Sequence, residues 1–279
     1  MLTDSATAIF DEAVNHLKGI VVPVQPNLLS NINAAYPDTE AMSELLLEDP
    51  ALCLSVLKIT SNTNASASLQ SSIREAAEDL GGQKIMVMLN AILLIMAKHG
   101  EFHSWIFEDY WETSRRVADI ATMMARQLNI PLVEEAHCLG ILHNVGMPFL
   151  WQKYPNYFEE IRKPTGQTLI EKENKLFNCD HATIGFYIAK GLHIDPCVCE
   201  AIRFHHICHD VFTGTNVASD KTITLLALLK LAESIVDESS QLLHQTDASE
   251  WELIKDPVLE TLGLSDLDYG DLADMIQAG

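Results

Sequence analysis

The stretch Leu139-Gly-Ile-Leu-His-Asn-Val-Gly146 places a histidine at the end of an apolar run, with a polar residue and a glycine soon after it. The apolar run predicts a buried helix, and the glycine predicts the end of that helix. The imidazole of His143 is therefore expected at the end of a buried helix. Two interpretations remain open: a core histidine bonded to a backbone carbonyl, or a ligand of a divalent metal that also takes carboxylate oxygens and water.

The rest of the chain is also predicted to be helical, because strand signals are scarce and most glycines and prolines fall at expected helix ends. Ser72 and Glu75 match a capping box, and Gly81-Gly82 predicts the end of that helix. A nearly uniformly apolar helix from Gln83 to His99 is expected at the centre of a bundle. Further helices are expected at 50–61, up to about 128, and at 131–146, 181–190, 197–209 and 222–238, with two short helices in 249–279. The predicted fold class is all-α.

Acidic residues outnumber basic ones, 39 against 18, which gives a formal net charge of −21. Such a surface repels phosphate backbones and anionic headgroups. Nucleic acids and membrane surfaces are therefore disfavoured as partners. A small anionic ligand stays possible, because the charge inside a pocket can differ from the net charge.

The cysteines and the N-terminus predict a cytoplasmic protein. The six cysteines show no disulfide-framework spacing, so reduced thiols are expected. The first ten residues hold no Lys or Arg, unlike a secretory signal. The apolar stretch Ile85–Ala97 is shorter than the span of about 20 residues that a membrane helix needs, so it is expected to be a buried helix.

Histidines and cysteines gather between His181 and His209. On one straight helix the side chains of Cys199 and His206 would share one face, and those of His205 and His209 another. A tetrahedral zinc site needs ligands from both faces. We therefore expect simple core cysteines here, with His205 or His206 contributing to a site that other helices complete.

Several motifs now follow one another in an order that resembles the HDOD domain family. They are Val22-Pro23-Val24-Gln25-Pro26, Glu48-Asp49-Pro50-Ala51-Leu52, Leu57-Lys58-Ile59-Thr60-Ser61-Asn62, Ser72-Ile73-Arg74-Glu75-Ala76 with Leu80-Gly81, Trp111-x-x-Ser114, Gly140-Ile141-Leu142-His143-Asn144-Val145-Gly146, Asp180-His181-x-x-x-Gly185 and Ala201-Ile202-x-x-His205-His206.

The resemblance implies a multi-helix HD-domain-like bundle with an N-terminal helical subdomain. It covers residues 18–240, with an N-terminal helical half at 18–100 and an HD-like half at 101–240. Residues 1–17 are expected to form an N-terminal helix, and residues 241–279 a C-terminal helical extension. HDOD domains are relatives of the HD superfamily of metal-dependent phosphohydrolases, and they generally serve bacterial signalling as output or interaction modules.

The same resemblance implies a degenerate metal site. In active HD hydrolases an upstream His, a His-Asp pair and a distal Asp hold the metal, whereas this chain has Thr113, His143-Asn144 and Glu233 at those positions. An amide is a weaker ligand than a carboxylate and cannot bridge two metals. The extra histidines of two-metal relatives are matched by His181, His205 and His206. A partial site for Mn, Fe, Ni, Zn or Mg is therefore expected at His143, His181, His205, His206 and Glu233.

Three functions follow as alternatives. The first is a non-catalytic signalling or scaffold module that binds a protein partner. The second is a metal-dependent phosphohydrolase of nucleotides or cyclic dinucleotides, with Arg115, Arg116 or Arg203 holding phosphate. The third is a sensor that binds a small anionic, nucleotide-like ligand in the vestigial pocket without chemistry. For the three arginines, surface salt bridges are the alternative interpretation.

Overall fold

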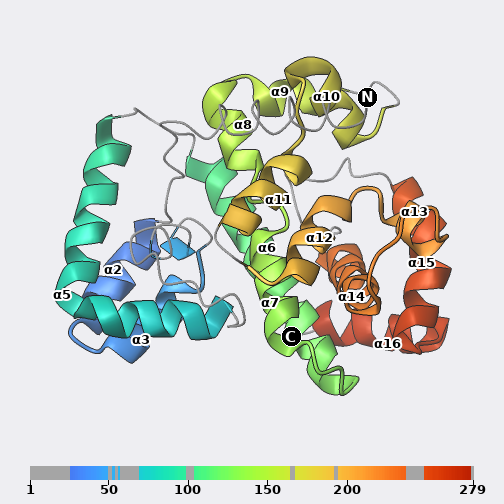
Figure 1. Ribbon diagram of the computed structural model, residues 1–279, viewed down its shortest axis with the longest axis horizontal. Helices are drawn as coiled ribbons and strands as arrows, with labels where there is room; N and C mark the ends of the chain where they lie inside the picture. The colour runs from blue at the N-terminus through green and yellow to red at the C-terminus, as the bar shows by residue number, and fades with distance from the viewer. Residues whose placement is uncertain are drawn as a thin grey trace.

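The computed structural model describes residues 26–49, 52–53, 56, 69–98, 104–163, 167–191, 194–236 and 248–277, and within these ranges all regular structure is helical (Figure 1). The helices are α2 (Pro26–Ala35), α3 (Thr39–Leu46), α5 (Leu69–Lys98), α6 (Ser104–Gln127), α7 (Val133–Leu142), α8 (Met147–Lys153), α9 (Tyr157–Ile161), α10 (Leu169–Phe177), α11 (His181–Gly191), α12 (Pro196–Phe204), α13 (Cys208–Phe212), α14 (Asp220–Val236), α15 (Ala248–Leu262) and α16 (Asp266–Gln277). The predicted all-α class is confirmed, whereas the helix expected at 1–17 lies outside the described residues.

Helices α2, α3 and α5 form the N-terminal helical subdomain, drawn in blue to teal at one side of the molecule (Figure 1). Helix α3 packs on both α2 and α5. Its start is fixed by Asp38, whose Oδ1 accepts the backbone N–H groups of Glu40 and Ala41, each at 3.1 Å. Asp49 likewise accepts the backbone N–H of Leu52 at 3.0 Å, as expected for the helix at 50–61, most of which lies outside the described residues.

Helix α5 is bent at Gly81, whose φ of 70° and ψ of 155° are not helical. The predicted helix end at this glycine is therefore confirmed, since residues other than glycine rarely adopt a positive φ. The predicted helix start at Ser72 is wrong, because α5 begins ahead of it at Leu69. The Ser-x-x-Glu spacing caps a helix only where the serine itself leaves the helical conformation, and Ser72 is helical.

The HD-like half is built around α6, α7 and α14, which pack on one another. The approach of α7 to α6 requires a glycine, since a Cβ on Gly140 would lie 2.3 Å from Ala118 Cα. Helix α14 runs through the core, with residues 225–232 all buried. Helices α11 and α12 pack on each other, and α12 also packs on α7 and α14. The ends of α7, α11 and α12 thus surround one buried region.

The prediction of one straight helix over 197–209 is wrong. Helix α12 ends at Phe204, a turn holds His205 and His206, and α13 begins at Cys208. On a continuous helix, neighbouring side chains would diverge by about 100°. The turn instead leaves the two imidazole rings 4.2 Å apart, centre to centre, so both can serve one site.

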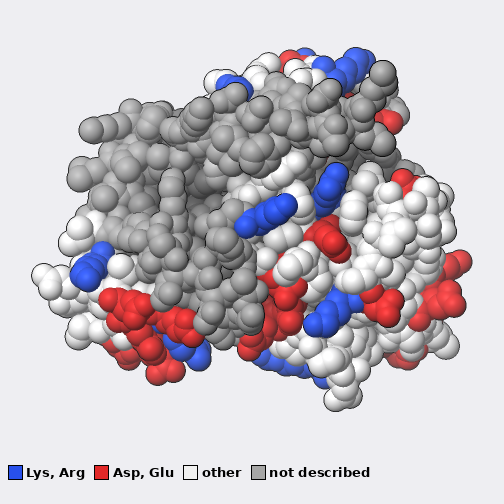
Figure 2. Space-filling view, viewed as in Figure 1, with Lys and Arg blue, Asp and Glu red and all other residues white. Residues whose placement is uncertain are grey.

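The C-terminal extension packs on the HD-like half through α15, which contacts α14 and α13. Its buried face includes Ile254, Val258 and Leu262. Within the described ranges, no helix combines the length and the apolar character that a membrane span requires. On the face shown in Figure 2, Asp and Glu side chains form groups along the lower edge, with Lys and Arg between them.

Candidate functional site

Three histidines meet where α11 begins and α12 ends. The ligand atoms of His181, His205 and His206 all lie within 4.8 Å of one another. The side chains of His181 and His205 are fully buried, and that of His206 is 10% exposed. The expectation that His205 or His206 joins a site completed by other helices agrees with this geometry. The cluster has the spacing and the ligand type that a transition metal requires.

The proton positions on three imidazoles follow from their partners. The Nδ1 atoms lie 2.7 Å from Glu173 Oε2 for His181, 2.7 Å from the Ile202 carbonyl for His205, and 2.8 Å from the Gly140 carbonyl for His143. Carbonyl and carboxylate oxygens accept hydrogen bonds, so each Nδ1 donates one and each neutral ring keeps its lone pair on Nε2.

The freed lone pairs of two rings face each other. The Nε2 atoms of His181 and His205 are 3.3 Å apart, and Asn144 Oδ1 lies 3.3 Å from His205 Nε2. Two acceptor atoms therefore lie next to the lone pair of His205 Nε2. Acceptors without a donor between them repel one another, and a cation relieves that repulsion. This part of the site fits a divalent metal, with His181, His205 and His206 as the residues that would hold it.

Glu173 of α10 orients the His181 ring through the Nδ1 atom of that ring. Its fully buried carboxylate accepts the His181 backbone N–H at 3.0 Å, the His181 Nδ1–H, and the hydroxyl of Tyr157. A carboxylate that fixes the tautomer of a histidine is a common support of metal ligands. No sequence signal distinguishes Glu173, because it lies on a helix rich in Lys, Glu and Asn.

The backbone at His181 lies in close contact with the backbone at Gly146, three residues after His143. A Cβ on Gly146, at the start of α8, would lie 2.1 Å from the His181 carbonyl oxygen. Because α8 begins shortly after His143 and Asn144, this contact fixes how far these two residues lie from His181. The glycine first interpreted as a helix end therefore also allows the two helices to meet.

The His143 half of the site is closed by hydrogen bonds of the protein itself. The Asn144 side-chain amide donates a hydrogen bond to His143 Nε2 at 2.9 Å. This hydrogen bond occupies the lone pair that a metal would need. Glu233 Oε1 also lies 3.4 Å from this nitrogen. An aspartate at position 144 could not donate in this way. The bond from His143 Nδ1 to the Gly140 carbonyl agrees with the first interpretation of His143, whereas its role as a metal ligand stays a prediction.

A buried lysine lies beside Glu233. The Lys230 ammonium is 2.9 Å from Glu233 Oε2 and 3.4 Å from Glu250 Oε1, and its side chain is 5% exposed. Burial by itself lowers the pKa of Lys230, but Glu233 and Glu250 outweigh it and hold that pKa above its ordinary value. Lys230 could have been noticed as the one charge within the apolar run 225–232. Glu250 could not, because it lies in the C-terminal extension.

Burial also favours the neutral form of His143, His205 and His206. Burial is the main cause that lowers the pKa of His143, and the Glu233 carboxylate opposes this lowering. Burial and the neighbouring imidazoles hold the pKa values of His205 and His206 well below their ordinary range. Neutral imidazoles are the form that binds metals.

The lowered pKa values predict a loss of stability in mild acid. In the unfolded chain a histidine takes up a proton near pH 6.5, whereas the folded site holds His205 and His206 neutral. Fewer protons are bound in the folded state, so the free energy of unfolding falls as the pH drops below about 6.5, by up to about 1.4 kcal/mol per pH unit for each such histidine. Urea unfolding between pH 7 and pH 5 measures the slope. His206→Gln should reduce the slope, and an unchanged slope would contradict this assignment.

The remaining predicted site residues are Thr113 and the three arginines. Thr113 is buried on α6, Arg115 on the same helix is exposed, and Arg116 is half-buried. The Arg203 guanidinium lies 5.4 Å from the centre of the Phe186 ring, which is a cation–π contact. A phosphate-binding role of the three arginines stays a prediction.

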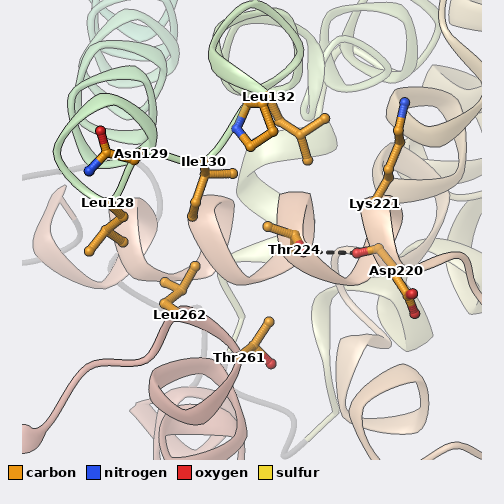
Figure 3. A pocket seen from close by; sticks show the side chains of 10 residues that line it. Leu128, Asn129, Ile130, Leu132, Asp220, Lys221, Thr224, Thr261 and Leu262 are labelled. Carbon is orange, nitrogen blue, oxygen red and sulfur yellow. Dashed lines mark hydrogen bonds between the residues drawn. The ribbon is translucent and has the colours of Figure 1, made fainter.

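A separate surface pocket of about 540 Å³ lies between the α6–α7 turn, the start of α14 and the end of α15 (Figure 3). Its lining is largely apolar, with Asp220 and Lys221 as its charged residues. The Thr224 hydroxyl donates to the Asp220 carbonyl at 2.8 Å across its wall. None of the predicted site residues lines this pocket, so it is distinct from the histidine site.

These observations define a class: an all-helical protein whose buried histidine cluster lies at the helix ends of an HD-like bundle. The model of the HDOD domain matches residues 21–208, and the chain belongs to this family. The matched segment includes His143, His181, His205 and His206, and it ends before Lys230, Glu233 and Glu250.

Solved structures share the fold. The MmoQ response regulator of Methylococcus capsulatus is 21% identical, with 91% of this chain and 98% of that one covered and a TM-score of 0.65. An HDOD domain protein of Geobacter sulfurreducens is 21% identical, with 98% and 95% covered and a TM-score of 0.54. A virulence factor of Campylobacter jejuni is 15% identical, with 95% and 99% covered and a TM-score of 0.60. No protein of curated function matches the chain.

Proposed function

We propose that this protein is a non-catalytic regulatory HDOD module of bacterial cytoplasmic signalling, which acts by binding a protein partner or a small anionic, nucleotide-like ligand. Its HD site is degenerate: a divalent metal at the three histidines would serve structure and not hydrolysis. The name of the similar MmoQ response regulator supports a place in signalling.

The observation that carries this proposal is the hydrogen bond from the Asn144 amide to His143 Nε2, at 2.9 Å. HD hydrolysis needs a metal held by the His-Asp pair, with water activated by the metal. Here the histidine lone pair is already used, and the amide brings no negative charge. Lys230 in turn neutralises Glu233, the remaining carboxylate at an HD position. The site is therefore satisfied without a catalytic metal.

A phosphohydrolase is the second candidate, and one observation favours it. The ligand atoms of His181, His205 and His206 lie within 4.8 Å of one another, and Glu173 supports them. Such a set could hold one metal and polarise a phosphate. The strong negative net charge disfavours nucleic acids as substrates, so nucleotides and cyclic dinucleotides are the compounds to screen.

The test is a hydrolysis screen of the full chain. The wild type and the His181→Ala variant are loaded with Mn, Fe, Ni, Zn or Mg and incubated with cyclic dinucleotides, nucleotides and a chromogenic phosphodiester. We expect equal background rates for both proteins, because the wild type has no catalytic metal. Metal-dependent turnover by the wild type that His181→Ala abolishes would establish the phosphohydrolase instead.

A further inference from the structure

The buried Lys230 is the centre of a small group of polar side chains, in which Glu233 and Glu250 are partly exposed. Its ammonium contacts the carboxylates of Glu233, from the same helix, and of Glu250, from α15, at 2.9 and 3.4 Å. The thiol of Cys208 donates to Glu250 Oε1 at 3.5 Å. His206 Nδ1 lies 3.9 Å from Glu250 Oε2. Oxygen, sulfur and nitrogen atoms thus surround one fixed positive charge.

Without the ammonium, the same side chains form a ligand set for a divalent ion. Two carboxylates, a thiol and an imidazole are the groups that bind zinc and cobalt in proteins. A bound transition metal deprotonates a coordinating thiol, so Cys208 could serve as a ligand.

An orphaned atom in the same place points to a ligand independently. His206 Nε2 is buried and has no hydrogen-bond partner among the residues that the structure describes. Leaving a polar atom buried and unpaired costs free energy, so its position needs a reason. The His206 ring belongs to the histidine cluster, and its other nitrogen, Nδ1, lies 3.9 Å from Glu250 Oε2. His206 thus connects the histidine cluster with the Lys230 group.

We propose that the Lys230 ammonium is a built-in cation that fills a second metal position beside the histidine cluster, and that Glu250 of the C-terminal extension completes this position. The lysine neutralises Glu233 and Glu250 and excludes a divalent ion from the space that it occupies. The C-terminal extension therefore contributes a residue, Glu250, to the site.

The test compares two substitutions that remove the same charge. Lys230→Ala removes both the charge and the side-chain volume, whereas Lys230→Met removes the charge and keeps most of the volume. We expect Lys230→Ala to bind about one more equivalent of Co²⁺ than the wild type, with the absorption of a thiolate ligand. Lys230→Met should bind no more than the wild type. In Lys230→Ala/Cys208→Ser, the thiolate absorption should disappear.

Equal metal content of the wild type and a folded Lys230→Ala variant would overturn the proposal. If Lys230→Ala does not fold, the neutral variant Lys230→Met/Glu233→Gln/Glu250→Gln decides. A counter-ion role predicts that this triple variant regains most of the melting temperature that Lys230→Met loses. A triple variant less stable than Lys230→Met would refute the role of Lys230 as a cation.

This inference does not rest on the proposed signalling role. Its test measures metal content and stability of the variants, whereas the proposed function is tested by hydrolysis with the wild type. Turnover by the wild type would end the non-catalytic proposal and leave the role of Lys230 intact. Failure of the Lys230→Ala variant to gain metal would end the proposed role of Lys230 and leave the non-catalytic proposal intact.

Discussion

Replacing Glu173 with alanine should destabilise the protein by about 3–5 kcal/mol, because three buried donors lose their acceptor at once. These donors are the Tyr157 hydroxyl, the His181 backbone N–H and the His181 ring. The carboxylate is fully buried, so in the alanine variant water cannot readily reach these donors and accept their hydrogen bonds. Urea unfolding at pH 7 measures the loss.

Glu171→Ala is the matched control, since Glu171 lies on the same helix but is exposed. There the carboxylate forms part of a capping box with Thr168, with its oxygen 2.9 Å from the Thr168 backbone nitrogen. Loss of such a cap costs about 1 kcal/mol. If Glu173→Ala costs no more than Glu171→Ala, Glu173 does not support the site as described.

Gly146→Ala should be comparably damaging, by about 3 kcal/mol or more, for a steric reason. The new Cβ would lie 2.1 Å from the His181 carbonyl oxygen. The backbone fixes the positions of both atoms, so a rotamer change cannot relieve the contact. The φ of Gly146 is −73°, which alanine adopts readily. The whole expected loss therefore comes from the clash. Thermal and urea unfolding measure it.

Gly270→Ala provides the control for this substitution. Gly270 is helical, and a Cβ there would meet nothing within 4 Å. Alanine in a helix is favoured over glycine by about 0.5–1 kcal/mol, so this variant should be slightly more stable than the wild type. Equal stabilities of the Gly146→Ala and Gly270→Ala variants would contradict the close approach of α8 to α11.

The sequence predicted those features that depend on local signals. The helical class, the break at Gly81 and the position of His143 at a helix end each follow from residues adjacent in the chain, and each is confirmed. The break after Phe204 was missed, because no glycine or proline marks it. Tertiary contacts of His205 and His206 hold that turn, and such contacts are not encoded in a short window.

The site was predictable where the family resemblance names a position, and not elsewhere. The convergence of His181, His205 and His206 agrees with the expectation. Glu173 and Glu250 were missed because they reach the histidines from helices whose composition is ordinary for a solvated surface. The charge of Lys230 within an apolar helix was a signal, but its two carboxylate partners could be found only from the fold.

The His143 half of the site is closed by the Asn144 amide, while the His181–His205 pair is open to a metal. Long-range proton–nitrogen spectra of histidine-labelled protein at pH 7 test it most directly, because they report the tautomer and the metal ligation of each ring. The expected result is a proton on Nδ1 of His143, His181 and His205, where each ring has an oxygen acceptor. On titration with Zn²⁺, the Nε2 signals of His181 and His205 should shift while that of His143 stays in place. A metal-induced shift of His143 Nε2 would contradict the account, since it would mean that the Asn144 amide does not hold that lone pair.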